Sequence, residues 1–155
     1  MNKYLFLLLI PISSFSQVIG FKEGIGITNS FTGNITAFSL SWEDRYNQIL
    51  KQKTEFGLWT DKMKNHSGSG YGAYSLGIKV IPNSFYLEAY LGGAFVTHTD
   101  KLLSTHFEFM HDLGFGLQDG RKSIGLNFKH LSNAGIKKPN IGRNFVQLSV
   151  KFPLF

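Results

Sequence analysis

The chain has 155 residues, of which 17 are glycine and 15 phenylalanine, and its formal net charge at pH 7 is +6. It contains no cysteine, which excludes a disulfide framework and a metal site with thiolate ligands. No stretch beyond residue 16 reaches the length of a transmembrane helix without charges. The positive charge indicates an anionic partner, but it does not distinguish nucleic acid from lipid phosphate.

Residues 1–16 have the layout of a secretion signal. Lys3 gives a positive start, an apolar run follows, and small residues up to Ser16 precede the rest of the chain. The apolar run of about nine residues is too short to cross a bilayer, which needs roughly twenty. The alternative is a buried N-terminal strand. We expect 1–16 to be removed and residues 17–155 to form one domain.

The rest of the chain alternates apolar and polar residues in short segments, separated by clusters of Gly, Asn, Asp, Ser and Pro. This pattern predicts antiparallel β-strands. The eight predicted strands are residues 17–28, 33–43, 50–60, 71–81, 85–97, 104–117, 123–132 and 144–154. The tight connections are 82–84 and 118–122, and the longer ones are 61–70, 98–103 and 133–143.

Each predicted strand has one apolar face and one polar or small face. In 85–97, for example, Phe85 and Leu87 oppose Glu88. A soluble lipocalin-like carrier would turn the apolar face inward, and alternation alone does not decide between the two orientations. The small residues of the polar faces suit a narrow lumen, and the terminal Phe155 resembles the assembly signal of outer-membrane barrels. We therefore predict an all-β, eight-stranded antiparallel transmembrane β-barrel in the outer membrane. Its expected lumenal charge network comprises Lys79, Glu88, Glu108, Asp112 and Lys129.

Candidate catalytic residues lie around the connection between the last two predicted strands. His130 and Ser132 continue the alternation of the apolar residues before them, so both are predicted on the lipid-facing side near a rim. A serine hydroxyl is a weak nucleophile until a base accepts its proton, and that base needs a third group to fix its tautomer. Alternate residues of one strand lie about 6.6 Å apart, most of which an imidazole ring can cover. The pair therefore suits nucleophilic acyl transfer.

Further groups complete this hypothesis. Asn144 begins the next strand with the alternation of its apolar residues, so it can approach the second ring nitrogen of His130 across the hairpin. Asn133 and the main-chain N–H groups around Gly135 are candidates for stabilising an oxyanion. The alternative is a polar strand end with ordinary capping, and spacing alone leaves both interpretations open.

The segment from His130 to Asn144 closely resembles the signature of the lipid A 3-O-deacylase (PagL-type) family, whose members are eight-stranded outer-membrane barrels that act on lipopolysaccharide. The resemblance implies that His130 is the general base, that Ser132 is the nucleophile and that Asn133 belongs to the oxyanion hole. At the third catalytic position the family has a glutamate, and the matching residue here is Asn144. An asparagine can orient a histidine but cannot stabilise its charged form as a carboxylate does, so we expect a slower enzyme.

The resemblance also gives a meaning to the basic residues of this loop. Lys137, Lys138 and Arg143 would meet lipid A phosphates at the rim of the outer leaflet, although a solvated loop face would explain them equally well. We expect no cofactor, no metal and no nucleic-acid partner. The other histidines show no metal-ligand spacing; they are His66, His98, His106 and His111.

The predicted function is hydrolysis of an ester-linked acyl chain of lipopolysaccharide, at the 3-position if the resemblance holds. A non-catalytic small outer-membrane barrel that retains the motif is the first alternative, and a soluble lipocalin-like carrier is the second. The sequence does not fix the acyl-chain length or the oligomeric state.

Overall fold

A computed structural model describes residues 17–27, 35–45, 48–61, 66–100 and 102–154. The predicted secretion signal at 1–16 and the terminal Phe155 lie outside the described residues. Among the residues that the structure describes, no helix is long and apolar enough to cross a membrane.

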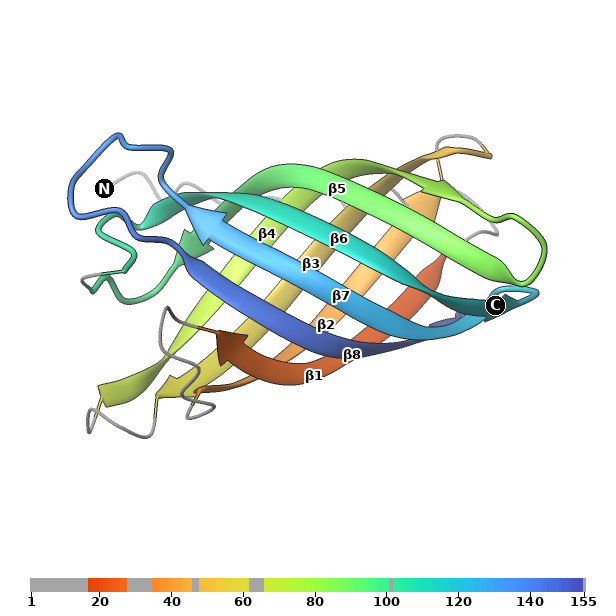
Figure 1. Ribbon diagram of the computed structural model, residues 1–155, viewed down its shortest axis with the longest axis horizontal. Helices are drawn as coiled ribbons and strands as arrows, with labels where there is room; N and C mark the ends of the chain where they lie inside the picture. Colours follow the sequence, from red (N-terminus) through yellow and green to blue (C-terminus); the bar gives the residue numbers. More distant parts are fainter. Residues whose placement is uncertain (1–16, 28–34, 46–47, 62–65, 101, 155) are drawn as a thin grey trace, which may run out of the picture.

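Eight antiparallel strands close into one barrel, in which consecutive strands pair and β1 also pairs with β8 (Figure 1). The closing pair runs in register from Val18 opposite Pro153 to Ile27 opposite Asn144, so the sheet has no open edge. The predicted fold is confirmed. The strands are β1 (Val18–Ile27), β2 (Ile35–Arg45), β3 (Leu50–Asp61), β4 (His66–Val80), β5 (Phe85–Val96), β6 (Phe107–Asp119), β7 (Lys122–Ser132) and β8 (Arg143–Pro153).

Two strand starts differ from the predicted ones by three or more residues, and the other strand ends differ by at most two. β4 begins at His66 instead of residue 71, because its glycine- and serine-rich start still pairs with β3 across an irregularity between Trp59 and Asp61. β6 begins at Phe107 instead of residue 104. Here the Thr105 hydroxyl donates to the Phe107 carbonyl at 2.6 Å, which bends the backbone into a loop before pairing starts.

The long and the short connections between strands lie at opposite ends of the barrel. The β5–β6 loop (residues 97–106) and the β7–β8 loop (residues 133–142) lie together at the left end in Figure 1. The short β4–β5 and β6–β7 turns lie at the opposite end. Any group carried by the two long loops is therefore presented at one rim.

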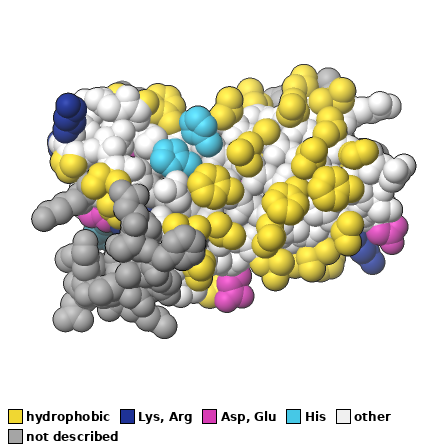
Figure 2. All heavy atoms as spheres, viewed as in Figure 1, with side chains coloured by type: hydrophobic (Ala, Val, Ile, Leu, Met, Phe, Trp, Pro, Cys, Tyr) yellow, Lys and Arg dark blue, Asp and Glu magenta, His cyan; other side chains and the backbone are white. Residues whose placement is uncertain are grey.

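The apolar side chains form the outer wall, where Figure 2 shows hydrophobic residues spread over the visible face. In β7, Ile124 is 50% exposed and Phe128 is 43% exposed, whereas Asn127 is 1% and Lys129 is 0% exposed. A lipocalin-like carrier requires the reverse arrangement, so that alternative is wrong. An apolar wall around a polar interior is the arrangement of a transmembrane β-barrel.

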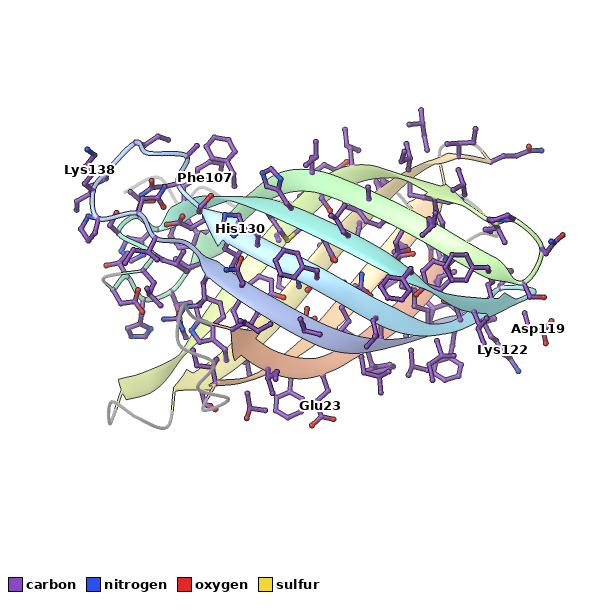
Figure 3. The ribbon with its side chains drawn as sticks, viewed as in Figure 1. Glu23, Phe107, Asp119, Lys122, His130 and Lys138 are labelled. Atoms are coloured by element: carbon purple, nitrogen blue, oxygen red, sulfur yellow. The ribbon has the colours of Figure 1, made fainter. Side chains whose placement is uncertain are left out.

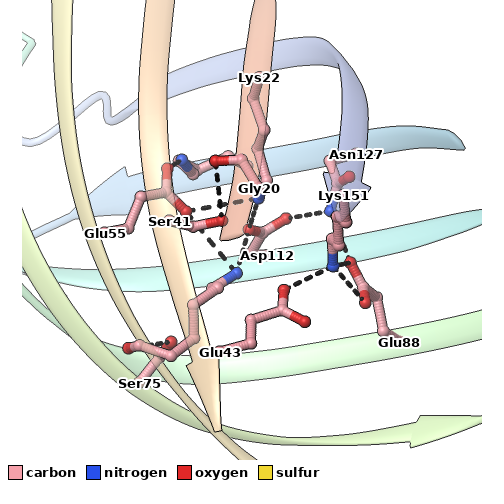
Figure 4. A network of polar contacts seen from close by, with 12 residues as sticks. Gly20, Lys22, Ser41, Glu43, Glu55, Ser75, Glu88, Asp112, Asn127 and Lys151 are labelled. Atoms are coloured by element: carbon pink, nitrogen blue, oxygen red, sulfur yellow. Dashed lines mark hydrogen bonds and ion pairs between the residues drawn. The ribbon is translucent and has the colours of Figure 1, made fainter. Parts of the chain in front are cut away.

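Charged side chains fill the lumen and bind one another (Figure 4). The Asp112 carboxylate accepts hydrogen bonds from the ammonium groups of Lys22 and Lys53, each at 2.5 Å. Glu55 accepts from Lys22 at 3.3 Å and also from Lys129. All five side chains are buried, so the charges compensate one another rather than being solvated.

A second group of charges lies nearer the turn end of the lumen. Lys151 donates to Glu43 at 2.5 Å and to Glu88 at 2.7 Å, and Lys79 lies 3.8 Å from Glu88. Glu108, which we predicted in the network, instead accepts from Thr105 of the β5–β6 loop. The other four predicted members, Lys79, Glu88, Asp112 and Lys129, do lie among these ion pairs.

Candidate active site

Strand register places His130 at the centre of a row of polar side chains on the outer wall. His130 lies opposite His111 of β6 on one side and opposite Asn144 of β8 on the other. The two imidazole rings meet edge to face with centroids 6.0 Å apart. Histidine side chains lie side by side on the outer face in Figure 2, and Figure 3 places His130 towards the loop end of β7. The row lies within the apolar wall, because Phe107 and Phe109 of β6 are exposed on its loop side.

Asn144 holds the His130 ring from the neighbouring strand. The Nδ1 atom of His130 lies 2.7 Å from the Oδ1 atom of Asn144. Because an amide oxygen only accepts hydrogen bonds, this contact requires that Nδ1 carries the proton. The other nitrogen, Nε2, then has a free lone pair, which is the state that a general base needs.

Ser132 lies on the same outward face as His130, two residues closer to the loop end of β7, and it pairs with Phe109 of β6. Both side chains are half-buried. Among the described residues, no hydrogen bond joins the Ser132 hydroxyl to the His130 ring. Catalytic hydrogen bonds are often long without substrate, so the shared face is the informative observation.

Gly142 forms one wall of the space that the His130 ring occupies. A Cβ atom built on Gly142 would lie 2.6 Å from Cε1 and 3.2 Å from Nε2 of His130. The backbone φ of Gly142 is +79°, which also favours glycine. Only a residue without a side chain fits here while the ring keeps its place.

The β7–β8 loop is organised around Asn133, which is 0% exposed. Its side-chain nitrogen donates to the Ser104 hydroxyl at 2.9 Å and to the Lys137 carbonyl at 3.0 Å. Its side-chain oxygen accepts from the Gly135 N–H at 3.0 Å, and its own N–H donates to the Asn140 side chain at 3.0 Å. The two oxyanion candidates from the sequence therefore bond to one another in this arrangement.

The three cations predicted to meet lipid phosphate lie in different places. Arg143 is 2% exposed, because it is the first residue of β8 and points into the barrel, where it pairs with Asp100. Its guanidinium lies 5.4 Å from the centre of the Trp59 ring. The structure therefore places Arg143 away from the lipid surface. Lys137 and Lys138 are exposed, and Figure 3 shows Lys138 at the tip of the loop.

The chain is similar to known proteins over most of its length. The model of the family described as lipid A 3-O-deacylase (PagL) matches residues 18–153. This chain belongs to the lipid A 3-O-deacylase family. A curated relative in the family, the lipid A deacylase PagL of Bordetella bronchiseptica, is 40% identical over 72 residues. That alignment covers 44% of this chain and 40% of the relative, so it spans less than half the length of the relative.

Solved structures agree with the fold of the PagL family. The crystal structure of the outer membrane enzyme PagL matches with a TM-score of 0.73 and 20% identity, over 88% of this chain and 99% of that one. A de novo designed transmembrane β-barrel matches with a TM-score of 0.61 and 10% identity, over 90% of this chain and 96% of that one. At these identities the likeness concerns the fold.

Two neighbours of the PagL-family motif were missed from the sequence, namely His111 and Gly142. The tight β6–β7 turn pairs Asp119 with Lys122, and counting back from this pair puts His111 opposite His130. The predicted connection at 118–122 left this register open, so the pairing of His111 with His130 comes from the structure. The position of Gly142 against the ring also comes from the structure, because it depends on the path of a long loop.

Other polar groups lie away from this family site. Glu23 is outward-facing but pairs with Leu148, well below the rim, and Figure 3 shows it at the lower edge of the barrel in that view, away from His130. His106 bonds to the Val96 carbonyl at 2.8 Å. Within the described residues, no group of three or more potential ligands could hold a metal ion.

Proposed function

We propose that this chain is an outer-membrane enzyme that hydrolyses an ester-linked acyl chain of lipid A. The observation that carries the proposal is the His130 ring, bonded to Asn144 at 2.7 Å and sharing the lipid-facing wall with Ser132. A site on the outer wall of a filled barrel is accessible to a substrate that itself lies in the membrane. Family membership supports lipid A as that substrate and the 3-position as the ester.

The reaction runs through an acyl-enzyme. The Ser132 oxygen attacks the ester carbonyl while Nε2 of His130 takes the hydroxyl proton. His130 then gives this proton to the departing sugar oxygen, and the acyl chain stays on Ser132. Water, deprotonated by His130, releases the fatty acid and restores the serine. Throughout, Asn144 accepts the Nδ1–H hydrogen bond and keeps the ring in one tautomer.

The oxyanion is assigned to the start of the β7–β8 loop, where Asn133 and Gly135 follow the nucleophile in sequence. In the substrate-free arrangement the Gly135 N–H donates to Asn133. For this N–H to reach the oxyanion, its hydrogen bond to Asn133 must break when substrate binds. A developing negative charge is a stronger acceptor than an amide oxygen and favours such an exchange.

The surroundings of the site suit the boundary between headgroups and acyl chains. Ile136 and Ile141 of the β7–β8 loop are 69% and 57% exposed, which is costly in water and favourable against lipid. Lys137 and Lys138 lie between them in sequence and are exposed. We assign these lysines to the phosphates of lipid A, and we assign no such role to the buried Arg143.

The test is hydrolysis by purified barrel in vesicles that contain lipid A. Mass spectrometry should detect lipid A that has lost one acyl chain, together with the free fatty acid. We expect Ser132→Ala and His130→Ala each to abolish this loss, because nucleophile and base are both required. Ser84→Ala, an exposed serine in the turn at the opposite end, should keep full activity.

Two results would contradict the proposal. Full activity of Ser132→Ala would exclude the serine mechanism. A wild-type barrel that releases no fatty acid from any lipid A would favour the alternative of a non-catalytic barrel that retains the motif.

A further inference from the structure

The β5–β6 loop binds both ends of the β7–β8 loop. At the end that follows β7, the Asn133 side chain donates to the Ser104 hydroxyl at 2.9 Å, and this hydroxyl donates to the Lys137 carbonyl at 2.9 Å. At the end that precedes β8, the Gly142 N–H donates to the Leu102 carbonyl at 3.1 Å. The loop that carries the proposed active-site residues is thus held by a loop from elsewhere in the chain.

Asp100 organises this second contact. One of its carboxylate oxygens accepts from the N–H groups of Leu102 at 2.7 Å and Leu103 at 2.9 Å. The other oxygen pairs with the guanidinium of Arg143, the residue that directly precedes Asn144. Burial by itself raises the pKa of Asp100, but the N–H groups and the guanidinium outweigh it and hold the pKa below its ordinary value. The carboxylate therefore stays charged and keeps both contacts.

The contacts of Asp100 are anchored in the interior. Leu103 is 1% exposed and belongs to the same buried apolar cluster as Leu131 and Phe145, which flank the site on β7 and β8. Arg143 is also buried, over Trp59. A displaced carboxylate would leave a buried guanidinium without its counter-ion, which is costly, so the arrangement resists displacement.

We propose that Asp100 is a positioning residue for His130. It fixes Arg143 and with it the start of β8, where Asn144 accepts from the His130 ring. Through the turn at Leu102 it also fixes Gly142, which packs against the same ring. Both groups that confine His130 are therefore held by one carboxylate, which lies outside the motif. This role rests on the proposed function and adds a residue to its site.

The first experiment distinguishes the ion pair between Asp100 and Arg143 from the hydrogen bonds that Asp100 accepts in the turn at Leu102. Asp100→Asn keeps an oxygen for the Leu102 and Leu103 N–H groups but loses the ion pair with Arg143, whereas Asp100→Ala loses both. We expect kcat to fall roughly tenfold in Asp100→Asn and further in Asp100→Ala, with KM little changed, because misplacing a catalytic group by a fraction of an ångström has effects of this order. The matched control is Asp119→Ala, an exposed carboxylate at the opposite end of the barrel, which should keep wild-type kcat.

The second experiment distinguishes positioning from general stabilisation. If Asp100 acts through Asn144, then Asp100→Ala should lower kcat far less in an Asn144→Ala background than in the wild type. Additive losses in the double variant would overturn the proposal, and so would an unchanged kcat in Asp100→Ala. Thermal unfolding of each variant monitors the barrel itself.

A third measurement does not depend on the reaction. In an NMR spectrum of the refolded barrel, the side-chain amide resonance of Asn144 should shift or broaden in Asp100→Ala and stay in place in Asp119→Ala. An unshifted resonance would overturn the positioning role even if the enzyme is active. If the resonance shifts in Asp100→Ala but the wild-type barrel hydrolyses no lipid A, the proposed function is refuted and the positioning contact stands.

Discussion

Asn144 is the residue in which this chain departs from the PagL-type motif, which has a glutamate at this position. Its contact with His130 shows which functions of that carboxylate an amide can perform. The amide oxygen accepts from Nδ1 at 2.7 Å, so the ring is oriented and its tautomer is set. An amide carries no charge, so it does not favour the imidazolium that forms when His130 accepts the serine proton. Asn144 therefore keeps the orientation of the His130 ring but does not stabilise its imidazolium form.

The first prediction at this scale concerns Asn144. Asn144→Ala should lower kcat by about one to two orders of magnitude, because the ring loses the hydrogen bond at Nδ1 while nucleophile and base remain. Asn144→Glu should keep or raise kcat, since a carboxylate both orients the ring and stabilises its charged form. Initial rates of fatty-acid release give the comparison, and a lower kcat for Asn144→Glu would contradict the orienting role.

Gly142 allows a second prediction with a close control. Gly142→Ala should lower activity roughly tenfold or more, because the new Cβ would lie 2.6 Å from the His130 ring and must displace it. Gly120→Ala in the β6–β7 turn introduces the same kind of backbone strain, at a φ of +57°, but its Cβ meets nothing within 4 Å. If both variants lose activity equally, strain at a glycine with positive φ rather than the contact with the His130 ring is responsible.

At the scale of elements, the β7–β8 loop combines two kinds of surface. Its buried side chains bind the β5–β6 loop, and its exposed side chains are apolar or basic. Ile136 and Ile141 suit the hydrocarbon boundary, and Lys137 and Lys138 suit an anionic headgroup layer. The rigid underside therefore supports a tip that can contact the membrane.

This division predicts a salt-dependent role for the two lysines. Replacing Lys137 and Lys138 with alanine should raise KM for lipid A in vesicles roughly five- to twentyfold at low salt, because each lysine is attracted to an anionic surface. The difference should shrink as the NaCl concentration rises, since screening removes the attraction. Lys122→Ala, an exposed lysine at the turn end, serves as the control. A KM increase that does not change with salt would argue against a phosphate contact.

On the scale of the whole molecule, ion pairs in the lumen join distant strands. Asp112 neutralises Lys22 and Lys53 at once, and all three side chains are fully shielded from solvent. Backbone pairing joins each strand to its two neighbours in the closed barrel. Ion pairs that cross the lumen join strands that are not neighbours, here β6 to β1 and β3.

Asp112→Asn should therefore destabilise the barrel by about 3–5 kcal/mol, because it removes the carboxylate that pairs with two buried ammonium groups and leaves Glu55 as their remaining counter-ion among the described residues. Urea unfolding of the refolded protein, followed by tryptophan fluorescence, measures the free energy of unfolding. Asp119→Asn, at the exposed end of the same strand, should change it little. A small effect of Asp112→Asn would mean that the lumen is hydrated enough to compensate the charges.

Much of the fold was predictable because the face of a β-strand residue is a local property. Period-two alternation assigned Ile124 and Phe128 to the wall and Asp112 and Lys129 to the lumen, and the structure agrees. Where alternation gives way to glycine and serine, as at the start of β4, the strand boundary was wrong. There the pairing with β3 decides the structure, and no single strand encodes it.

For the candidate site, the sequence by itself determined that His130, Ser132 and Asn144 share the outer face, since parity along two strands and one hairpin fixes their directions. Only the tertiary structure decided where Arg143 points and what it meets. One additional strand residue at the start of β8 turns its side chain inward, onto Asp100 of the β5–β6 loop. Contacts between loops depend on closure of the whole barrel, which brings their ends to the same rim, and no local periodicity records that closure.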